Sequence, residues 1–281
     1  MSNLIRTLID DGWVSLTVAD TTEMVKTAQK LHRLSKTSAQ ILGKALSAMT
    51  FMSSCLKNEQ GEISLSFQTD GESGSIGVSG NRALTMRGYI QNTELTKDTE
   101  ISALGNKGAF TIIRDDGYNR PFVGTCAMPV GGDLDDGFEE YYAISEQLFT
   151  RLATKVEFDE NGEVTFAGVI ALQPLPFASE EIIVKTENAE IDFLFEELKH
   201  KGVVATAKDN FKVDQSVFEQ RFAQYKCNCS REYLSRVLVS LGEAELRRII
   251  KEDGDIKVHC HYCNSDYSFD ETDADELFKK E

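Results

Sequence analysis

The sequence predicts an α+β protein with a large N-terminal domain of mixed sheet and helix, a helical linker and a small cysteine-rich C-terminal domain. Three observations support this prediction. The apolar period changes between helical and alternating spacing in the first 176 residues, Pro174 and Pro176 close that block, and four of the six cysteines lie after residue 225. A length of 281 residues is also typical of about two domains.

Two helices are predicted near the start of the chain. Apolar residues recur at intervals of three and four positions, first from Met24 to Leu31 and then from Ile41 to Met52. The most apolar stretch, residues 45–56, lies between two lysines and covers 12 residues, whereas a membrane-spanning helix needs about 20. We therefore expect a buried helix of a globular domain there.

The helical period then gives way to alternation, which predicts strands. Ile63, Leu65 and Phe67 alternate with polar residues, and a glycine-rich turn at 70–74 leads to a second alternating run, as in a β-hairpin. A second hairpin is predicted around the turn at 159–162. Further strands are expected at 85–91, 110–114 and 122–128, and a helix at 138–152.

The residues after Pro176 differ in composition from those before it. The stretches 180–200 and 213–223 place aliphatic and phenylalanine side chains among many carboxylates, which predicts an acidic, helical linker. The cysteine-rich tail begins at Lys226. We therefore divide the chain into an α+β core domain at 1–176, a helical linker at 177–225 and a C-terminal domain at 226–281.

The net charge of −16 argues against two classes of function. Nucleic-acid binding draws most of its affinity from lysine and arginine side chains that neutralise phosphates, and an anionic membrane surface repels this chain for the same reason. Asp10 and Asp11 arrive before the apolar core of a signal peptide can form. We therefore expect a cytoplasmic protein without nucleic-acid or membrane partners, in a compartment where structural disulfides are rare.

The C-terminal cysteines predict a metal site. Cys227 and Cys229 are followed, after 30 residues, by Cys260 and Cys263. Two close pairs of this kind can direct four thiolates at one tetrahedral Zn²⁺ ion. We expect one zinc ion per chain, in a site that is either purely structural or sensitive to redox conditions.

The remaining candidates for metal or thiol chemistry are weaker. His259 and His261 flank Cys260, so either histidine is an alternative zinc ligand. Cys55 lies on the apolar helix and Cys126 in an apolar strand, and both are predicted to be small core residues rather than nucleophiles.

A zinc–thiolate site can also act as a switch. Zinc keeps the sulfurs deprotonated, and thiolates are the form that oxidants attack. If each close pair formed a disulfide, the ion would lose all four ligands. A domain of about 55 residues has a marginal core, so its folding is expected to depend on the metal and to be lost on oxidation.

Several motifs resemble the 33 kDa chaperonin family, and the resemblance covers essentially the whole chain. The motifs are Cys227-Asn228-Cys229-Ser230-Arg231-Glu232, Cys260-His261-Tyr262-Cys263 followed by Tyr267 and Phe269, Met86-Arg87-Gly88-Tyr89, Tyr142-Ala143-Ile144-Ser145-Glu146-Gln147 and Gln173-Pro174-Leu175-Pro176.

The resemblance implies a redox-regulated, ATP-independent chaperone (a holdase) rather than an enzyme. The reduced, zinc-bound form would be inactive. Oxidative stress, usually with heat, would join Cys227 to Cys229 and Cys260 to Cys263 and release the zinc. The tail would then unfold, and the oxidised form, expected to be a homodimer, would bind unfolding client proteins. Five linker phenylalanines are candidate client-binding residues: Phe193, Phe195, Phe211, Phe218 and Phe222.

Two other functions are compatible with the cysteines. A thiol–disulfide oxidoreductase would use Cys260 and Cys263, but such a pair usually lies at a helix N-terminus beside a βαβ sheet. A zinc-ribbon binding module would use the four cysteines for structure alone, and its binding to a partner would not depend on redox state.

Overall fold

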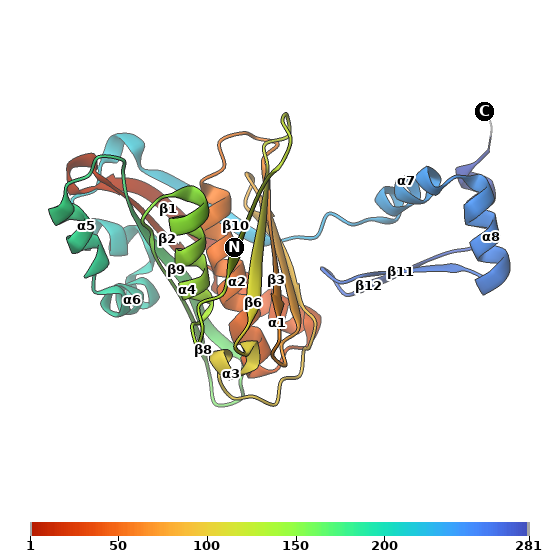
Figure 1. Cartoon of the computed structure of the whole chain (residues 1–281), viewed down its shortest axis with the longest axis horizontal. Coiled ribbons are helices and arrows are strands. Elements are labelled where there is room, and N and C mark those ends of the chain that lie inside the picture. Colours follow the sequence, from red (N-terminus) through yellow and green to blue (C-terminus); the bar gives the residue numbers. More distant parts are fainter. Residues whose placement is uncertain (1, 280–281) are drawn as a thin grey trace. The chain divides into compact units, whose positions relative to one another are not determined.

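The computed structural model describes residues 2–279, which form two compact units. The first unit extends to Lys226 and the second begins at Cys227 (Figure 1). A large sheet and many helices together make the predicted α+β class correct. In the part of the chain that the structure describes, no helix is long and apolar enough to cross a lipid bilayer.

A ten-stranded sheet is the framework of the first unit, with the strand order β7-β6-β3-β4-β5-β10-β1-β2-β9-β8. Neighbouring strands run antiparallel, except that β10 and β5 are parallel. The strands are β1 (Ser2–Ile9), β2 (Val14–Asp20), β3 (Glu62–Thr69), β4 (Ser75–Asn81), β5 (Thr85–Ile90), β6 (Gly108–Asp115), β7 (Phe122–Ala127), β8 (Arg151–Phe158), β9 (Val164–Pro174) and β10 (Glu219–Tyr225).

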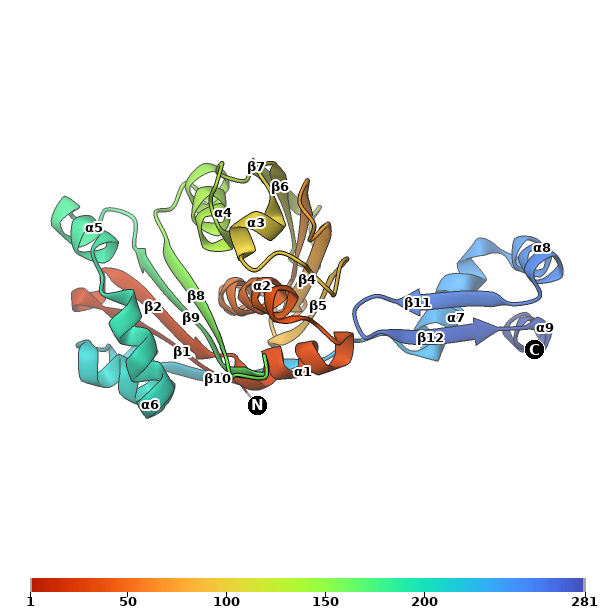
Figure 2. The ribbon, with the colours of Figure 1, turned by 90° about the horizontal axis from the view of Figure 1, so that it is seen from below.

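Helix α2 (Lys36–Ser54) is the centre of the first unit. All of its residues except Lys36 and Gln40 are buried, because it packs against strands from both halves of the curved sheet (Figure 2). Its N-terminus is capped by the Ser35 side chain, which accepts a hydrogen bond from the Ser38 N–H. The predicted buried helix is therefore confirmed. Three shorter helices lie on the same side: α1 (Thr22–His32), α3 (Glu100–Leu104) and α4 (Leu134–Tyr141).

A buried ion cluster joins α2 to α3 and α4. The Lys44 ammonium lies 2.9 Å from Glu100, 2.8 Å from Asp133 and 3.5 Å from Asp135. These carboxylates also bind backbone groups, because Glu100 accepts the Leu134 N–H and Asp135 accepts the Thr154 N–H. Desolvation raises the pKa of Asp135 to about 7. The cluster thus connects the central helix to α3 and α4 and, through Asp135, to β8.

The predicted helix at 138–152 is wrong beyond its first residues. Helix α4 ends at Tyr141, a π-helical turn η2 (Tyr142–Glu146) follows, and β8 begins at Arg151. The helical spacing of apolar residues continues past α4, but pairing with β9 decides the conformation. Leu152 lies opposite Ala171 of β9, and its N–H donates to Glu139 of α4.

The segment 177–225 is only partly helical. It contains α5 (Glu180–Glu187), α6 (Ile191–Asn210), a short 3-10 turn η3 (Gln215–Val217) and the strand β10. The helical prediction for 213–223 is therefore wrong at β10, because this strand fills the position between β1 and β5 in the sheet. The whole segment belongs to the first compact unit. Its separate role as a linker stays a prediction.

Sequence periodicity did not identify β1 and β2, two strands that are joined by a short 3-10 turn, η1 (Asp10–Gly12). Their inward and outward faces are both covered: α2 packs on β2 from one side, and α6 packs on both strands from the other. Strands buried on both faces carry apolar residues without clear alternation, so the pattern of a half-buried strand is absent.

The second unit is small. It contains α7 (Arg231–Leu241), α8 (Glu243–Asp253), β11 (Ile256–Cys260), β12 (Ser265–Phe269) and α9 (Glu271–Leu277). Strands β11 and β12 form an antiparallel hairpin with Cys260 opposite Ser265. The buried core consists of five side chains: Leu238, Leu246, Ile250, Phe269 and Ala274.

Candidate metal centre

The four C-terminal cysteines meet at one point of the second unit. The sulfur atoms of Cys227, Cys229, Cys260 and Cys263 all lie within 4.8 Å of one another, and each cysteine is unbridged. The Cys227 and Cys260 sulfurs are 3.8 Å apart, and those of Cys229 and Cys263 are 3.0 Å apart. The structure therefore unites two cysteine pairs that the sequence separates by 30 residues.

The hairpin loop fixes one pair of cysteines. Cys260 ends β11, and the Cys263 N–H donates to the Cys260 carbonyl at 3.3 Å. Asn264 then takes a left-handed conformation with φ 51°, which asparagine tolerates better than most residues. Ser265 starts β12 and donates its hydroxyl hydrogen to the Cys263 carbonyl. This tight turn directs both sulfurs to the same side.

The other cysteine pair is held at the start of α7. Ser230 is the N-cap of this helix and accepts a hydrogen bond from the Tyr233 N–H. The next residue, Arg231, extends to the hairpin and to α9, where its guanidinium donates to the Ser268 carbonyl of β12 at 2.8 Å and to Asp273 of α9 at 2.6 Å. It also lies 4.4 Å from the centre of the Phe269 ring. These contacts bring the loop that carries Cys227 and Cys229 onto the hairpin.

The donor set fits a zinc ion. Zinc–sulfur bonds of about 2.3 Å in a tetrahedron place sulfurs about 3.8 Å apart, which is the separation between Cys227 and Cys260. Desolvation raises the pKa of the Cys227 thiol well above its usual range when no cation is present. Four thiolates this close need a compensating positive charge, so the cluster can hold a metal ion that prefers sulfur.

The two neighbouring histidines lie outside this group of ligands. The group of metal-ligating atoms found among residues 2–279 contains the four cysteines and neither His259 nor His261. His259 instead contacts Asp266 at 2.7 Å through its Nδ1 atom, and the two imidazole rings stack edge to face with centres 5.0 Å apart. The arrangement favours cysteine over histidine at all four positions.

The other two cysteines lie in the first unit. Cys126 is buried on β7, and Cys55 follows α2 and packs against the core. Desolvation raises the pKa of Cys126 to about 11 and also raises that of Cys55. Both side chains therefore remain neutral thiols near pH 7, and neither belongs to the metal cluster.

The five candidate client-binding phenylalanines do not form one surface. Phe195 is buried beside Phe166, whereas Phe193 and Phe222 are each at least half exposed, at 50% and 55%. Phe218 is partly buried against the core, with the Lys208 ammonium over its ring. The structure thus separates these residues into one core side chain, two exposed ones and others at the boundary.

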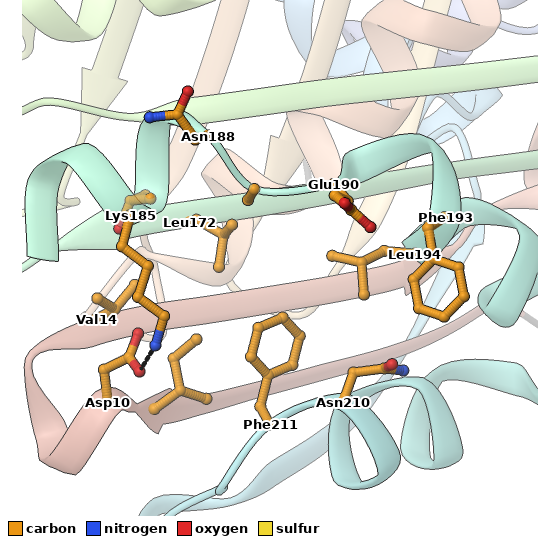
Figure 3. Close-up of a pocket in the computed structure, with 13 residues that line it drawn as sticks. Asp10, Val14, Leu172, Lys185, Asn188, Glu190, Phe193, Leu194, Asn210 and Phe211 are labelled. Atoms are coloured by element: carbon orange, nitrogen blue, oxygen red, sulfur yellow. Dashed lines mark hydrogen bonds and ion pairs between the residues drawn. The ribbon is translucent and has the colours of Figure 1, made fainter.

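Two of the phenylalanines share a cavity of about 320 Å³ (Figure 3). Phe193 and Phe211 line it from the beginning of α6 and from the residue after its end, and Leu194 and Leu172 contribute apolar surface. An ion pair between Lys185 and Asp10 lies at its edge. The cavity is a preformed, largely apolar site between the segment predicted as a linker and strands of the predicted core domain.

Sequence reasoning identified the four cysteines but not the residues that place them. Arg231 and Tyr267 were noted only as parts of a motif, yet Arg231 fixes α7 and the Tyr267 hydroxyl lies 3.3 Å from the Cys229 sulfur. The order cysteine, serine, arginine is consistent with an N-cap and an anchoring residue, but the partners Ser268 and Asp273 are 37 and 42 positions away. Only the folded unit reveals them.

Known proteins resemble the chain over nearly its full length. The family described as Hsp33 protein matches residues 2–270. The 33 kDa chaperonin of Bacillus cytotoxicus is 33% identical over 291 residues, which cover 98% of each chain. That of Bacillus mycoides is 33% identical over 290 residues, covering 99% of this chain and 98% of its own. A crystal structure of the 33 kDa chaperonin from Thermotoga maritima has the same fold, with a TM-score of 0.77, 24% identity, and coverage of 98% of this chain and 97% of the other.

Proposed function

The chain belongs to the Hsp33 family of heat-shock chaperones, and from that premise we propose that it is a redox-regulated, ATP-independent holdase of the cytoplasm. It would bind unfolding proteins under oxidative or heat stress without being an enzyme. The observation that carries the proposal is the cluster of four unbridged cysteines in a unit with a five-residue core. Such a unit can be folded or unfolded by the chemistry of its sulfurs.

In the reduced protein, Cys227, Cys229, Cys260 and Cys263 would together hold one Zn²⁺ ion. When bound, zinc supplies positive charge that keeps the four sulfurs as thiolates. Thiolates are the nucleophilic form, so these cysteines would react with oxidants before Cys55 or Cys126 do. The inactive form would be the folded, metal-bound one.

Oxidation would join Cys227 to Cys229 and Cys260 to Cys263. Each disulfide removes two electrons from two thiolates, and one hydrogen peroxide molecule accepts them with two protons to give two waters. The sulfurs of a disulfide no longer serve as thiolate ligands, so the cluster would lose its metal. With only five buried core side chains, the second unit would then unfold.

The oxidised protein would present apolar surface to unfolding clients and would form a homodimer. The candidate client-binding residues are Phe193, Phe195, Phe211, Phe218 and Phe222. Exposed Phe193 and Phe222 would contact clients directly, whereas the buried Phe195 would first require α6 to separate from the sheet. The high density of carboxylates around them would keep the opened form soluble.

The proposal is tested by the aggregation of heat-unfolded citrate synthase, measured with reduced and with peroxide-treated protein while released zinc is titrated with a chromophoric chelator. We expect suppression only after treatment, together with one zinc ion released per chain. A Cys55→Ser, Cys126→Ser double variant should behave like the unaltered protein, and Cys260→Ser should lose the redox dependence. Suppression by the reduced form alone, or oxidation without zinc release, would contradict the proposal.

A further inference from the structure

The two edges of the ten-stranded sheet differ in how they are protected. β8 ends the sheet on one side and β7 ends it on the other. An edge strand exposes backbone N–H and C=O groups that can pair with another extended chain, so proteins commonly cover or charge such edges. Comparing β7 with β8 therefore indicates which edge is open to a partner.

The β8 edge is covered by carboxylates. The Leu152 N–H donates to Glu139 and the Thr154 N–H to Asp135, each at 2.9 Å, so α4 satisfies two of its outward donors. The strand also carries three charged residues, Arg151, Lys155 and Glu157. Both features oppose the addition of another strand.

The β7 edge has neither form of protection. Its sequence, Phe-Val-Gly-Thr-Cys-Ala, contains no charge and no proline. Within residues 2–279, no hydrogen bond reaches the outer backbone edge of this strand. Its side-chain hydrogen bonds, Thr125 with Thr111 and Cys126 with Gly137, lie on its faces. The edge is therefore open in the first unit.

The register identifies the backbone groups that point outward. The Met128 N–H donates to the Gly108 carbonyl, and these residues lie opposite each other in the continued register of β6 and β7. In an antiparallel pair, the backbone groups of every second residue bond to the partner strand. The N–H and C=O groups of the even-numbered residues of β7 therefore point toward β6. The N–H and C=O groups of Val123, Thr125 and Ala127 consequently point away from the sheet.

The side chains of these three residues are also exposed, which gives the edge an apolar side. Val123 is 57% exposed and lies opposite Ile113, which is 39% exposed. An incoming strand could thus extend the apolar Val123–Ile113 pair with a side chain of its own.

We propose that the β7 edge binds an extended, uncharged or basic segment of a non-native protein as an eleventh strand. Backbone pairing does not depend on the partner's side chains, which suits a binder of many sequences. This inference rests on the proposed chaperone function and names a client site outside the linker phenylalanines. A weak backbone site here and apolar surface released on oxidation would together hold one client more tightly than either alone.

Charge favours a foreign segment over a second copy of this chain. Pairing two β7 edges would bring together two molecules that each carry a net charge of −16, without the apolar surface that would favour the homodimer of the oxidised form. A segment with flanking lysines is instead attracted. The occupant is therefore a client strand, and self-pairing is an outcome that the experiment can detect.

The experiment uses the reduced, zinc-loaded full-length protein, so that its result is independent of oxidative activation. The probe is a capped peptide of alternating valine and threonine with a lysine at each end. Hydrogen exchange is measured by NMR at Val123, Thr125 and Ala127. We expect these amides to be slowed by the peptide, while the outward amide of Val156 on β8 is unchanged. A peptide of the same charge with alternate amides N-methylated should protect none of them.

Two substitutions at one position provide a matched pair. Thr125→Pro removes an outward donor and is tolerated on an edge strand, whereas Thr125→Val keeps the donor; both lose the hydroxyl contact with Thr111. We expect about tenfold weaker peptide binding for the proline variant and less than a twofold change for the valine variant.

Three results would overturn the inference. The first is unchanged exchange of the β7 amides at the highest soluble peptide concentration. The second is equal binding of the N-methylated peptide, a comparison that holds even if the proline variant does not fold. The third is slow exchange of the β7 amides in concentrated protein without peptide, together with a dimer that the substitution Thr125→Pro dissociates. That result would mean that the β7 edge binds a second copy of this chain.

Discussion

Arg231 places two metal ligands although it is not a ligand itself. Its guanidinium is bound by the Ser268 carbonyl and by Asp273, and it lies against the Phe269 ring. The planar guanidinium donates to both oxygen partners while it stacks on the ring. A lysine ammonium cannot do both, so lysine cannot fully replace Arg231. Together with the contact between Cys229 and Tyr267, this side chain holds Cys227 and Cys229 at the hairpin.

Replacing Arg231 with alanine should therefore weaken zinc binding by about 10- to 100-fold, the range found when outer partners of metal ligands are removed. The zinc affinity of Arg231→Lys should lie between that of Arg231→Ala and that of the unaltered protein. Competition with a chromophoric chelator measures the affinity. Arg248→Ala is the matched control, since among residues 2–279 Arg248 forms its ion pairs with Glu245 and Glu252 of its own helix. Equal zinc affinity for Arg231→Ala and the unaltered protein would contradict this role.

Asp135 is a second residue whose environment sets its chemistry. Desolvation raises its pKa from the ordinary value of 3.8 to about 7, although the Lys44 ammonium opposes the shift. The native state therefore binds a proton that the unfolded state has already released between about pH 4 and pH 7. The stability that this proton contributes is present at low pH and is lost as the pH rises through 7.

Asp135→Asn should reduce the change in the free energy of unfolding between pH 4 and pH 7, because asparagine resembles the protonated acid in shape and charge. Its amide can still accept the Thr154 N–H and donate to the Thr154 hydroxyl oxygen. Urea unfolding at pH 5.5 and pH 8, followed by the fluorescence of the single Trp13, should show that the unaltered protein loses about 2 kcal/mol of its free energy of unfolding. Asp135→Asn should lose less free energy of unfolding over the same pH interval. The control substitution Glu160→Gln, at an exposed position, should leave the loss as it is in the unaltered protein. An identical loss in Asp135→Asn would exclude Asp135 as the source of this pH dependence.

At the scale of elements, local patterns predicted those whose apolar residues repeat with a regular period. The buried helix α2 and the β3–β4 hairpin were expected from spacing alone, because their apolar residues repeat at 3.6 or 2 positions. Strands β1, β2 and β10 were missed or assigned to helix. Their conformation depends on partners far away in sequence, such as Leu4 opposite Arg221.

The same limit applies to the linker phenylalanines. Sequence spacing cannot distinguish Phe193 from Phe195, which are two positions apart on α6, yet one is half exposed and the other is buried against Phe166. The distinction arises where α6 meets the sheet. It matters for function, because only a side chain that is exposed can bind a client without prior unfolding.

At the scale of the whole molecule, the chain divides into a large unit and a small one with very different cores. The first unit buries dozens of apolar side chains, whereas the second has five in its core. A unit of this size is marginal without a metal. Loss of the metal should therefore affect the two units differently.

Chelation of zinc from the reduced protein should unfold the second unit and leave the first folded. Hydrogen exchange should become fast across 231–277 and stay slow in α2, and added zinc should restore protection. Trp13 fluorescence serves as an internal control for the first unit. Continued protection of α7 and α8 after complete removal of zinc would mean that the five-residue core is sufficient.

The sequence by itself determined the α+β class, the buried central helix, the four cysteines of the metal centre and a net charge that argues against nucleic-acid partners. These follow from short-range spacing and from composition. Only the tertiary structure decided that β10 lies between β1 and β5, that Arg231 anchors the cysteine loop and that β7 is an open edge while β8 is covered. The physical reason is that strand pairing and side-chain anchoring join residues distant in sequence, and no local period records which partner a strand or a guanidinium will find.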